Sequence, residues 1–228
     1  MRPLVALRPK LLSVRQLEQV EPSLARALGL DPARHVSAGF VTCDQDDSLY
    51  AALDHATKFA DVDVVYAKSF YAGSAHASGP LSGEIMGVLA GPNPAEVAEG
   101  LWALREALTT KIHFVSFEGT NGPAFFPHVI SETGRYLAPL ANVAPGRPLA
   151  YLIAPPVEAM IGLDAALKAA NVTLQKFFGP PTETNFAGAY LTGALPDVEA
   201  AARAFTEAIE AVVRSPLGGL VRPERERR

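Results

Sequence analysis

Two similar stretches of sequence decide the fold: LDHATKFADVDV at residues 53–64 and LDAALKAANVTL at residues 163–174. They align at a shift of 110 residues, and Leu, Asp, Ala, Lys, Ala and Val recur at matching positions. Further along, VLAG at 88–91 resembles YLTG at 190–193, and each leads through a proline into an alanine-rich helix. Chance similarity explains either pair alone, but two pairs in the same order favour an internal duplication.

Each copy repeats the same order of predicted elements. In the first copy the apolar pattern predicts strands at 36–42, 62–66 and 84–90 and helices at 48–60 and 94–108. In the second copy it predicts strands at 149–154, 172–177 and 186–192 and helices at 157–170 and 196–213. Asn93 is a typical cap for the helix that starts at Pro94.

A further helix is expected before each copy, and the evidence is clearest for the first. Ser13 and Gln16 resemble a capping box, and an apolar stripe ends at a glycine that suits a helix stop: Leu17, Val20, Leu24, Leu28 and Gly29. Strands and helices mixed in this way predict an α+β fold of two tandem domains, each an antiparallel sheet flanked by helices. We expect domains at 1–117 and 118–215, separated near the Gly-Thr-Asn-Gly-Pro segment, and a disordered charged tail at 216–228.

Composition excludes several classes of function. The chain of 228 residues has a formal net charge of -4 and scattered basic residues, so nucleic acid is not an expected partner. It has one cysteine and no apolar run long enough to cross a bilayer, so we expect a cytoplasmic protein with no membrane partner.

The sequence lacks the residue patterns of an enzyme. Its five histidines are dispersed, and no second cysteine is available, so no metal site and no cofactor are expected. The single cysteine, Cys43, lies beside Asp44, which suppresses thiolate formation and favours a buried, inert thiol. The glycines of segment 73–83 are not followed by the Lys-Ser or Lys-Thr of a phosphate loop, so a surface loop is expected there.

The acidic run at 44–47 permits two interpretations. Asp47 can cap the helix that follows it, since a carboxylate at a helix N-terminus accepts free backbone N–H groups. Alternatively, one of these carboxylates forms, with Glu84, an anionic recess for a small ammonium compound. Spacing alone does not decide between them.

The chain resembles a known family, the tandem-domain trimeric shell proteins of ethanolamine-utilisation bacterial microcompartments. The resemblance covers nearly the whole chain and is most specific in these runs: DQDD at 44–47, DVVY at 63–66, GE at 83–84, GPNPAE at 91–96, AYL at 150–152, DAALK at 164–168 and PPTETN at 180–185. It implies two tandem circularly permuted microcompartment shell domains. Three chains would form a pseudohexagonal tile in the microcompartment shell, in contact with other shell proteins.

The resemblance also implies site residues. Segments 69–79 and 179–186 correspond to loops that gate a central pore, with these candidate residues: Phe70, Tyr71, Gly73, His76, Gly79, Thr182 and Asn185. The family binds ethanolamine in a carboxylate-lined recess, which implies Asp46 and Glu84 as ligands, Asp47 as an alternative acid and Phe114 as the aromatic or backbone contact. For the second segment, ordinary flexible turns remain an alternative.

Two rival functions stay open at this stage. A non-assembling small-amine binding or regulatory protein would be monomeric. An enzyme that uses Asp46 and Glu84 as an acid and base would turn over an amine.

Overall fold

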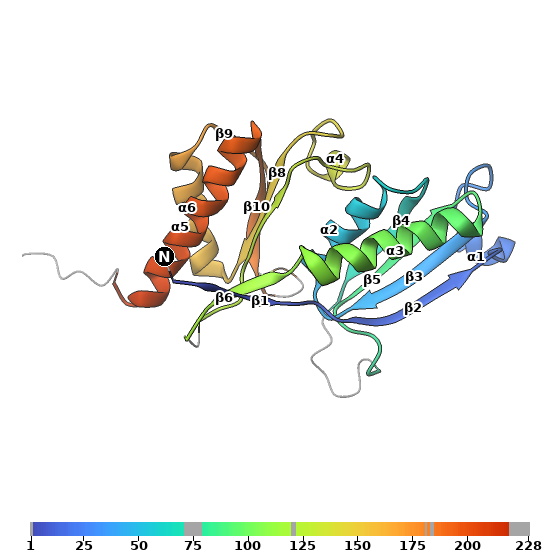
Figure 1. Ribbon diagram of the computed structural model, residues 1–228, viewed down its shortest axis with the longest axis horizontal. Helices are drawn as coiled ribbons and strands as arrows, with labels where there is room; N and C mark the ends of the chain where they lie inside the picture. The colour runs from blue at the N-terminus through green and yellow to red at the C-terminus, as the bar shows by residue number, and fades with distance from the viewer. Residues whose placement is uncertain (1, 71–78, 120–121, 181, 183–184, 219–228) are drawn as a thin grey trace, which may run out of the picture.

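The computed structural model describes residues 2–70, 79–119, 122–180, 182 and 185–218. Its main feature is one arrangement built twice (Figure 1). The first half contains β2 (Leu11–Leu17), α1 (Pro22–Ala27), β3 (Ser37–Cys43), α2 (Asp46–Ala56), β4 (Asp63–Ser69), β5 (Ile85–Gly91) and α3 (Pro94–Thr110). The second half repeats this order with β7 (Phe126–Ile130), α4 (Leu137–Leu140), β8 (Leu149–Ala154), α5 (Pro156–Ala169), β9 (Val172–Phe178), β10 (Ala187–Gly193) and α6 (Leu195–Arg214).

The two sheets have the same topology. Their strand orders are β2-β3-β5-β4 and β7-β8-β10-β9, and every neighbouring pair is antiparallel. The longer helices of each half, α2 with α3 and α5 with α6, cover one face of that half's sheet (Figure 1). The predicted α+β fold of two tandem domains is therefore confirmed.

The predicted elements lie within four residues of the observed ones. The largest shift is in α2, which begins at Asp46 and ends at Ala56. Asn93 caps α3 as expected, since its side-chain oxygen accepts the N–H groups of Ala95 and Glu96, both at 3.0 Å.

The helix predicted around residues 13–28 is wrong for its first part. Residues Leu11–Leu17 form strand β2, which pairs with β3 from Leu11 opposite Cys43 to Leu17 opposite Ala38. Only the short α1 is helical, and the Glu21 carboxylate caps it by accepting the N–H groups of Ser23 and Leu24. The buried backbone of β3 needs hydrogen-bond partners along its outer edge, and this requirement outweighs a weak local preference for helix.

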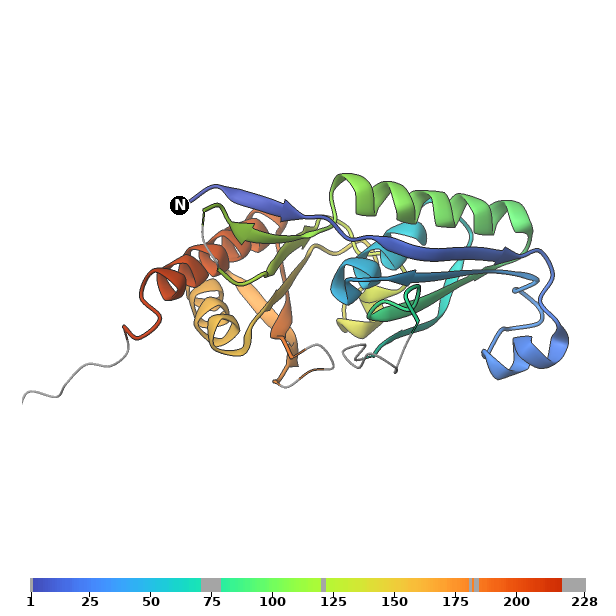
Figure 2. The same ribbon diagram turned by 90° about the horizontal axis from the view of Figure 1, so that it is seen from below.

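Three short strands were not expected from the sequence: β1 (Leu4–Leu7), β6 (Phe114–Phe117) and β7. The short helix α4 is the helix that was expected before the second copy. Strand β1 pairs antiparallel with β6, and β6 is bridged to Phe125 through Val115. The N-terminal segment also reaches the second half, where the Arg2 N–H donates to the Glu210 carboxylate on α6 at 3.0 Å (Figure 2). The domain boundary near 118–123 stays a prediction, and most of the expected tail at 216–228 lies outside the described residues.

Helix α2 lies between the two halves and holds them together. Asp54, fully buried, accepts the backbone N–H groups of Gly134 (2.7 Å), Tyr136 (3.2 Å) and Leu137 (2.7 Å) from the second half. Position 134 requires glycine, because a Cβ there would lie 2.4 Å from the Asp54 carbonyl oxygen. In the described residues, no helix is long and apolar enough to span a membrane.

Replacing Asp54 should loosen the contact between the halves. In Asp54→Asn, an amide N–H₂ group replaces one of the acceptor oxygens that face three N–H donors. We expect the free energy of unfolding to fall by about 2–4 kcal/mol, measured by urea denaturation. Glu99→Gln, the same change at an exposed position of α3, should alter it by less than about 0.5 kcal/mol. Equal effects from both variants would contradict this assignment.

Candidate functional site

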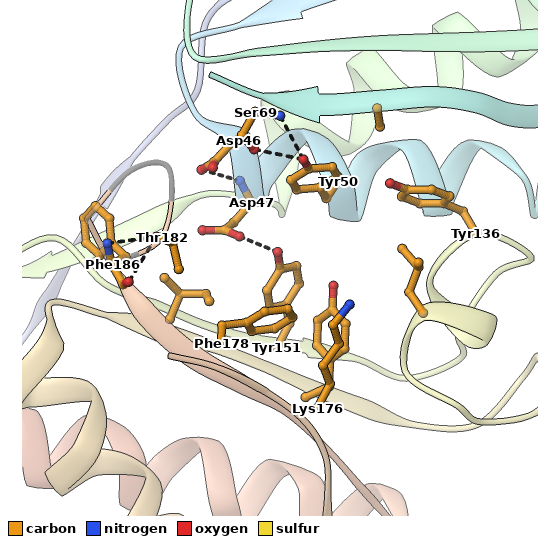
Figure 3. A pocket seen from close by; sticks show the side chains of 14 residues that line it. Asp46, Asp47, Tyr50, Ser69, Tyr136, Tyr151, Lys176, Phe178, Thr182 and Phe186 are labelled. Carbon is orange, nitrogen blue, oxygen red and sulfur yellow. Dashed lines mark hydrogen bonds between the residues drawn. The ribbon is translucent and has the colours of Figure 1, made fainter. Parts of the chain in front are cut away.

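A pocket of about 220 Å³ lies between the two halves (Figure 3). The first half contributes Asp46, Asp47 and Tyr50 from α2, with Ala67 and Ser69 from β4. Most of the opposite wall comes from the free face of the second sheet, through Tyr151, Ile153, Lys176, Phe178 and Tyr190. The docking of α2 by Asp54 therefore also fixes the two walls relative to each other.

The acidic end of the pocket is the first turn of α2. Asp46 and Asp47 are each only 7% exposed. The Asp46 carboxylate accepts the N–H of Asp47 at 2.8 Å, and the Asp47 carboxylate accepts the hydroxyl of Tyr151. The interpretation of Asp47 as a helix cap is wrong, because Gln45 occupies the cap position and Asp47 is turned toward Tyr151.

Burial and mutual repulsion disfavour the ionised forms of Asp47 and Glu84. Burial raises the pKa of Asp47 well above its ordinary value of 3.8, and the charges of Asp46 and Glu84 raise it further. Burial also raises the pKa of Glu84, with added repulsion from Asp46 and Asp44. A positively charged ligand would relieve this repulsion, so the arrangement favours a cation.

Glu84 and Phe114 border the pocket without lining it. The Glu84 N–H donates to the Cys43 carbonyl at 2.8 Å, and Gly83 precedes it at a φ of 65°, where a Cβ would lie 2.1 Å from that carbonyl oxygen. Phe114 packs edge-on against Phe186, a lining residue, at 5.7 Å between ring centroids. The structure thus brings Asp46 and Asp47 into the pocket, with Glu84 close enough to act on them through its charge.

The aromatic wall of the pocket was missed from the sequence. Tyr151 and Tyr190 meet edge-on at 4.6 Å, and Tyr50 stacks on Tyr136 at 6.4 Å between ring centroids. The Tyr50 hydroxyl is also bonded to the Ser69 hydroxyl at 2.8 Å. One signal was available in the sequence, because Tyr151 and Tyr190 are the hydroxyl-bearing aromatic residues in two otherwise apolar strands.

Both predicted pore segments start or end at the pocket. Ser69 and Thr182 line it, and Phe70 follows Ser69 directly. The Thr182 hydroxyl donates to the Phe186 carbonyl at 3.0 Å and accepts the Phe186 N–H at 3.1 Å, while Asn185 adopts a φ of 64°. Gly79 is exposed, and the candidates Tyr71, Gly73 and His76 lie outside the described residues.

The described residues offer no catalytic or metal-binding group at this site. Cys43 is fully buried, and burial raises the pKa of its thiol to about 12. Among the described side chains, no group of three or more His, Cys, Asp or Glu residues could hold a metal ion.

No protein-family model matches the chain. The bacterial microcompartment shell protein EutL of Clostridium perfringens is 50% identical over 212 residues, which cover 93% of this chain and 97% of that protein. A crystal structure of EutL from Clostridium perfringens superposes with a TM-score of 0.90 at 50% identity, covering 96% of this chain and 98% of that one.

A second solved structure, the ethanolamine utilisation protein EutL from Leptotrichia buccalis, gives a TM-score of 0.89 at 48% identity and covers 93% of this chain and 98% of that one. These likenesses extend over both halves and include the tandem arrangement. The chain therefore belongs to the EutL family of bacterial microcompartment shell proteins, and it is a structural shell component, not an enzyme.

Proposed function

We propose that three copies of this chain form a pseudohexagonal shell tile with a central pore, and that the pocket binds a small ammonium compound, ethanolamine, whose presence acts on the pore. The observation that supports assembly most directly is the different exposure of two equivalent helices. In α2, nine of eleven residues are buried, whereas in α5 four of fourteen are.

The two helices differ because only α2 has a sheet on both sides. Helix α2 packs on its own sheet and also against the free face of the second sheet. Its counterpart α5 leaves large apolar side chains exposed: Val157, Met160, Ile161 and Leu167. Ile161 is 49% exposed, whereas the equivalent Ala51 is 3% exposed. A second copy would cover this face in the way that the second half covers α2.

The surface that would cover α5 is the face of the first sheet that α2 and α3 leave uncovered, part of which packs against Ala25 and Leu28 of the α1 segment. There Phe40, Val65 and Met86 are partly buried apolar residues on the side away from α2 and α3. Docking α5 of one copy on this face of the next makes a head-to-tail contact like the one inside the chain. Repeating it closes a ring of three chains with six similar domains.

The pocket supports binding of an organic ammonium ion. An ammonium has three donors and no acceptor. Asp46 and Asp47 supply acceptors in the pocket, and Glu84 beside it adds negative charge. The rings of Tyr50 and Tyr151 lie beside Asp46 and Asp47 (Figure 3), and aromatic rings attract cations. Phe114, placed behind Phe186, would act on the ligand through that ring.

Ligand binding would reach the pore segments through shared residues. Ser69, Thr182 and Phe186 belong both to the pocket and to the segments 69–79 and 179–186. A ligand that binds more tightly to one arrangement of these segments shifts the population toward it.

The assembly proposal predicts that Ile161→Glu prevents trimer formation. A carboxylate placed in the proposed contact would have to be desolvated without a partner. Sedimentation of the wild type should show a trimer, and the variant should sediment as a folded monomer. Trp102→Glu changes a similarly exposed apolar residue on α3 and should leave the trimer intact. A monomeric wild type would contradict the proposal.

Asp47→Asn should weaken binding and improve stability at neutral pH. Because its pKa is raised in the folded protein, Asp47 contributes stability fully below pH 3.8, and this contribution is lost as the pH rises toward the raised pKa. The variant keeps an acceptor for Tyr151 and avoids that loss. Relative to the wild type, its free energy of unfolding should increase as the pH rises above 3.8, measured by urea denaturation over a series of pH values.

The same variant tests the pocket as a binding site. Calorimetric titration with ethanolamine should show affinity at least about ten-fold lower for Asp47→Asn than for the wild type. Glu99→Gln should bind like the wild type. Unchanged binding by Asp47→Asn would remove this carboxylate from the site.

The link to the pore is testable by hydrogen exchange. Ethanolamine should slow exchange in peptides that cover 179–186, and Thr182→Val, which cannot bond to Phe186, should abolish most of this slowing. Thr192→Val removes another threonine hydroxyl bond, to the Pro148 carbonyl, away from the pocket and should keep the ligand response. Slowing that persists in Thr182→Val would argue against this route.

A further inference from the structure

The pocket has a basic group opposite its acidic end. Lys176 lies on β9 and lines the pocket, and its ammonium is 5.3 Å from the centroid of the Phe178 ring. In Figure 3 this ammonium and the Asp47 carboxylate lie at different sides of the pocket, with Tyr151 between them. The pocket therefore presents opposite charges to a ligand at two separate places.

The Lys176 ammonium is available to a ligand. Among the described residues it forms no ion pair with a carboxylate and no hydrogen bond to a side chain, and the contact with Phe178 is through the ring face. Some other basic side chains of the second half do form ion pairs, for example Lys168 with Asp164 at 2.6 Å and Arg214 with Glu210 at 2.6 Å. An ammonium left unpaired beside a pocket is suited to an anionic group.

A second polar group lies near it. Tyr136 lines the pocket from the loop before α4, and its hydroxyl has no hydrogen-bond partner among the described residues. Burial raises the pKa of this hydroxyl, so it stays protonated and can donate to an anion. Lys176 and Tyr136 together provide donors at one end, and Asp46 and Asp47 provide acceptors at the other.

We propose that the pocket recognises small zwitterions of the ω-amino carboxylate class, with the ammonium on Asp46 and Asp47 and the carboxylate on Lys176 and Tyr136. This inference rests on the proposed amine-binding function of the same pocket and extends it to a second ligand group. A simple amine leaves Lys176 unpaired and faces its repulsion. A zwitterion satisfies both ends and brings no net charge.

Three probes separate the contributions of the two ends. β-Alanine carries both charges, propanoate keeps its carboxylate without the ammonium, and ethanolamine provides the ammonium without a carboxylate. In calorimetric titrations of the whole protein, β-alanine should bind about five- to ten-fold more tightly than ethanolamine, and propanoate should show no measurable binding.

Lys176→Met tests the basic end while keeping the apolar stem of the side chain. It should lower the β-alanine affinity about five- to ten-fold and leave ethanolamine binding unchanged or slightly tighter. Lys68→Met is the matched control. Lys68 lies between Ala67 and Ser69 on β4, and strand alternation directs it away from the pocket that those two residues line. This control should bind both ligands like the wild type.

The outcomes distinguish this inference from the function on which it rests. If ethanolamine binds and β-alanine binds no more tightly, the zwitterion inference is overturned while the amine pocket stands. If Lys176→Met weakens both ligands equally, Lys176 supports the pocket without contacting a carboxylate, and the inference is again overturned. If neither ligand binds the wild type, the amine pocket itself is refuted.

Discussion

The Asp54 carboxylate, which accepts three backbone N–H groups of the second half, is the interaction on which the rest of the structure depends. It joins the first turn after β7 to the last turn of α2 and leaves no room for a side chain at Gly134. A buried carboxylate is stable only when its acceptors are occupied, so this contact admits one arrangement of the halves. The position of α2 then determines where Asp46 and Asp47 meet the second sheet.

The pocket acids illustrate a conflict between stability and function. Desolvation and mutual repulsion raise the pKa values of Asp47 and Glu84, so both are costly to keep ionised. If the contact between the two halves were only structural, well-packed apolar residues would make it more stable. The chain is a shell protein of the EutL family, which lies in the microcompartment shell of the cytoplasm, and this costly cluster is what supports the proposal that the pocket binds a ligand.

Sequence reasoning recovered the parts of the fold that depend on local pattern and repetition. The duplication, the strands β3, β5, β8 and β10, and the helices α2, α3, α5 and α6 follow from periodicity, capping residues and the matching segments. It missed β2 because the stripe from Leu17 to Leu28 has helical spacing, whereas pairing with β3 is a long-range requirement. The short strands β1 and β6 were likewise missed, because they pair with each other across a long separation in the sequence.

The candidate site was predictable only on its acidic side. Asp46, Asp47 and Glu84 stand in acidic runs to which the family resemblance gives a ligand role. Tyr151 also stands in a matching run, but without a role, and Tyr151, Lys176 and Tyr190 come from three strands whose place opposite the acids depends on the docking of the halves. The position of Asp47 just before its predicted helix also favoured a capping role. The competing partner, the Tyr151 hydroxyl, is 104 residues away and could not be recognised from the local sequence.

The contrast between α2 and α5 shows what a fused pair of domains makes possible. Position 54 holds a buried acid that accepts hydrogen bonds, while the equivalent Asp164 has a 62% exposed side chain paired with Lys168. Asp47, buried in the first turn of α2, likewise has as its equivalent in α5 the exposed apolar residue Val157. In an assembly of single, identical domains, every interface between domains would have to form the pocket and also hold the assembly together. Duplication within one gene lets mutations change the contact inside the chain and the contact between chains independently. A ring of such chains can then alternate contacts that form a pocket with contacts that only hold the chains together.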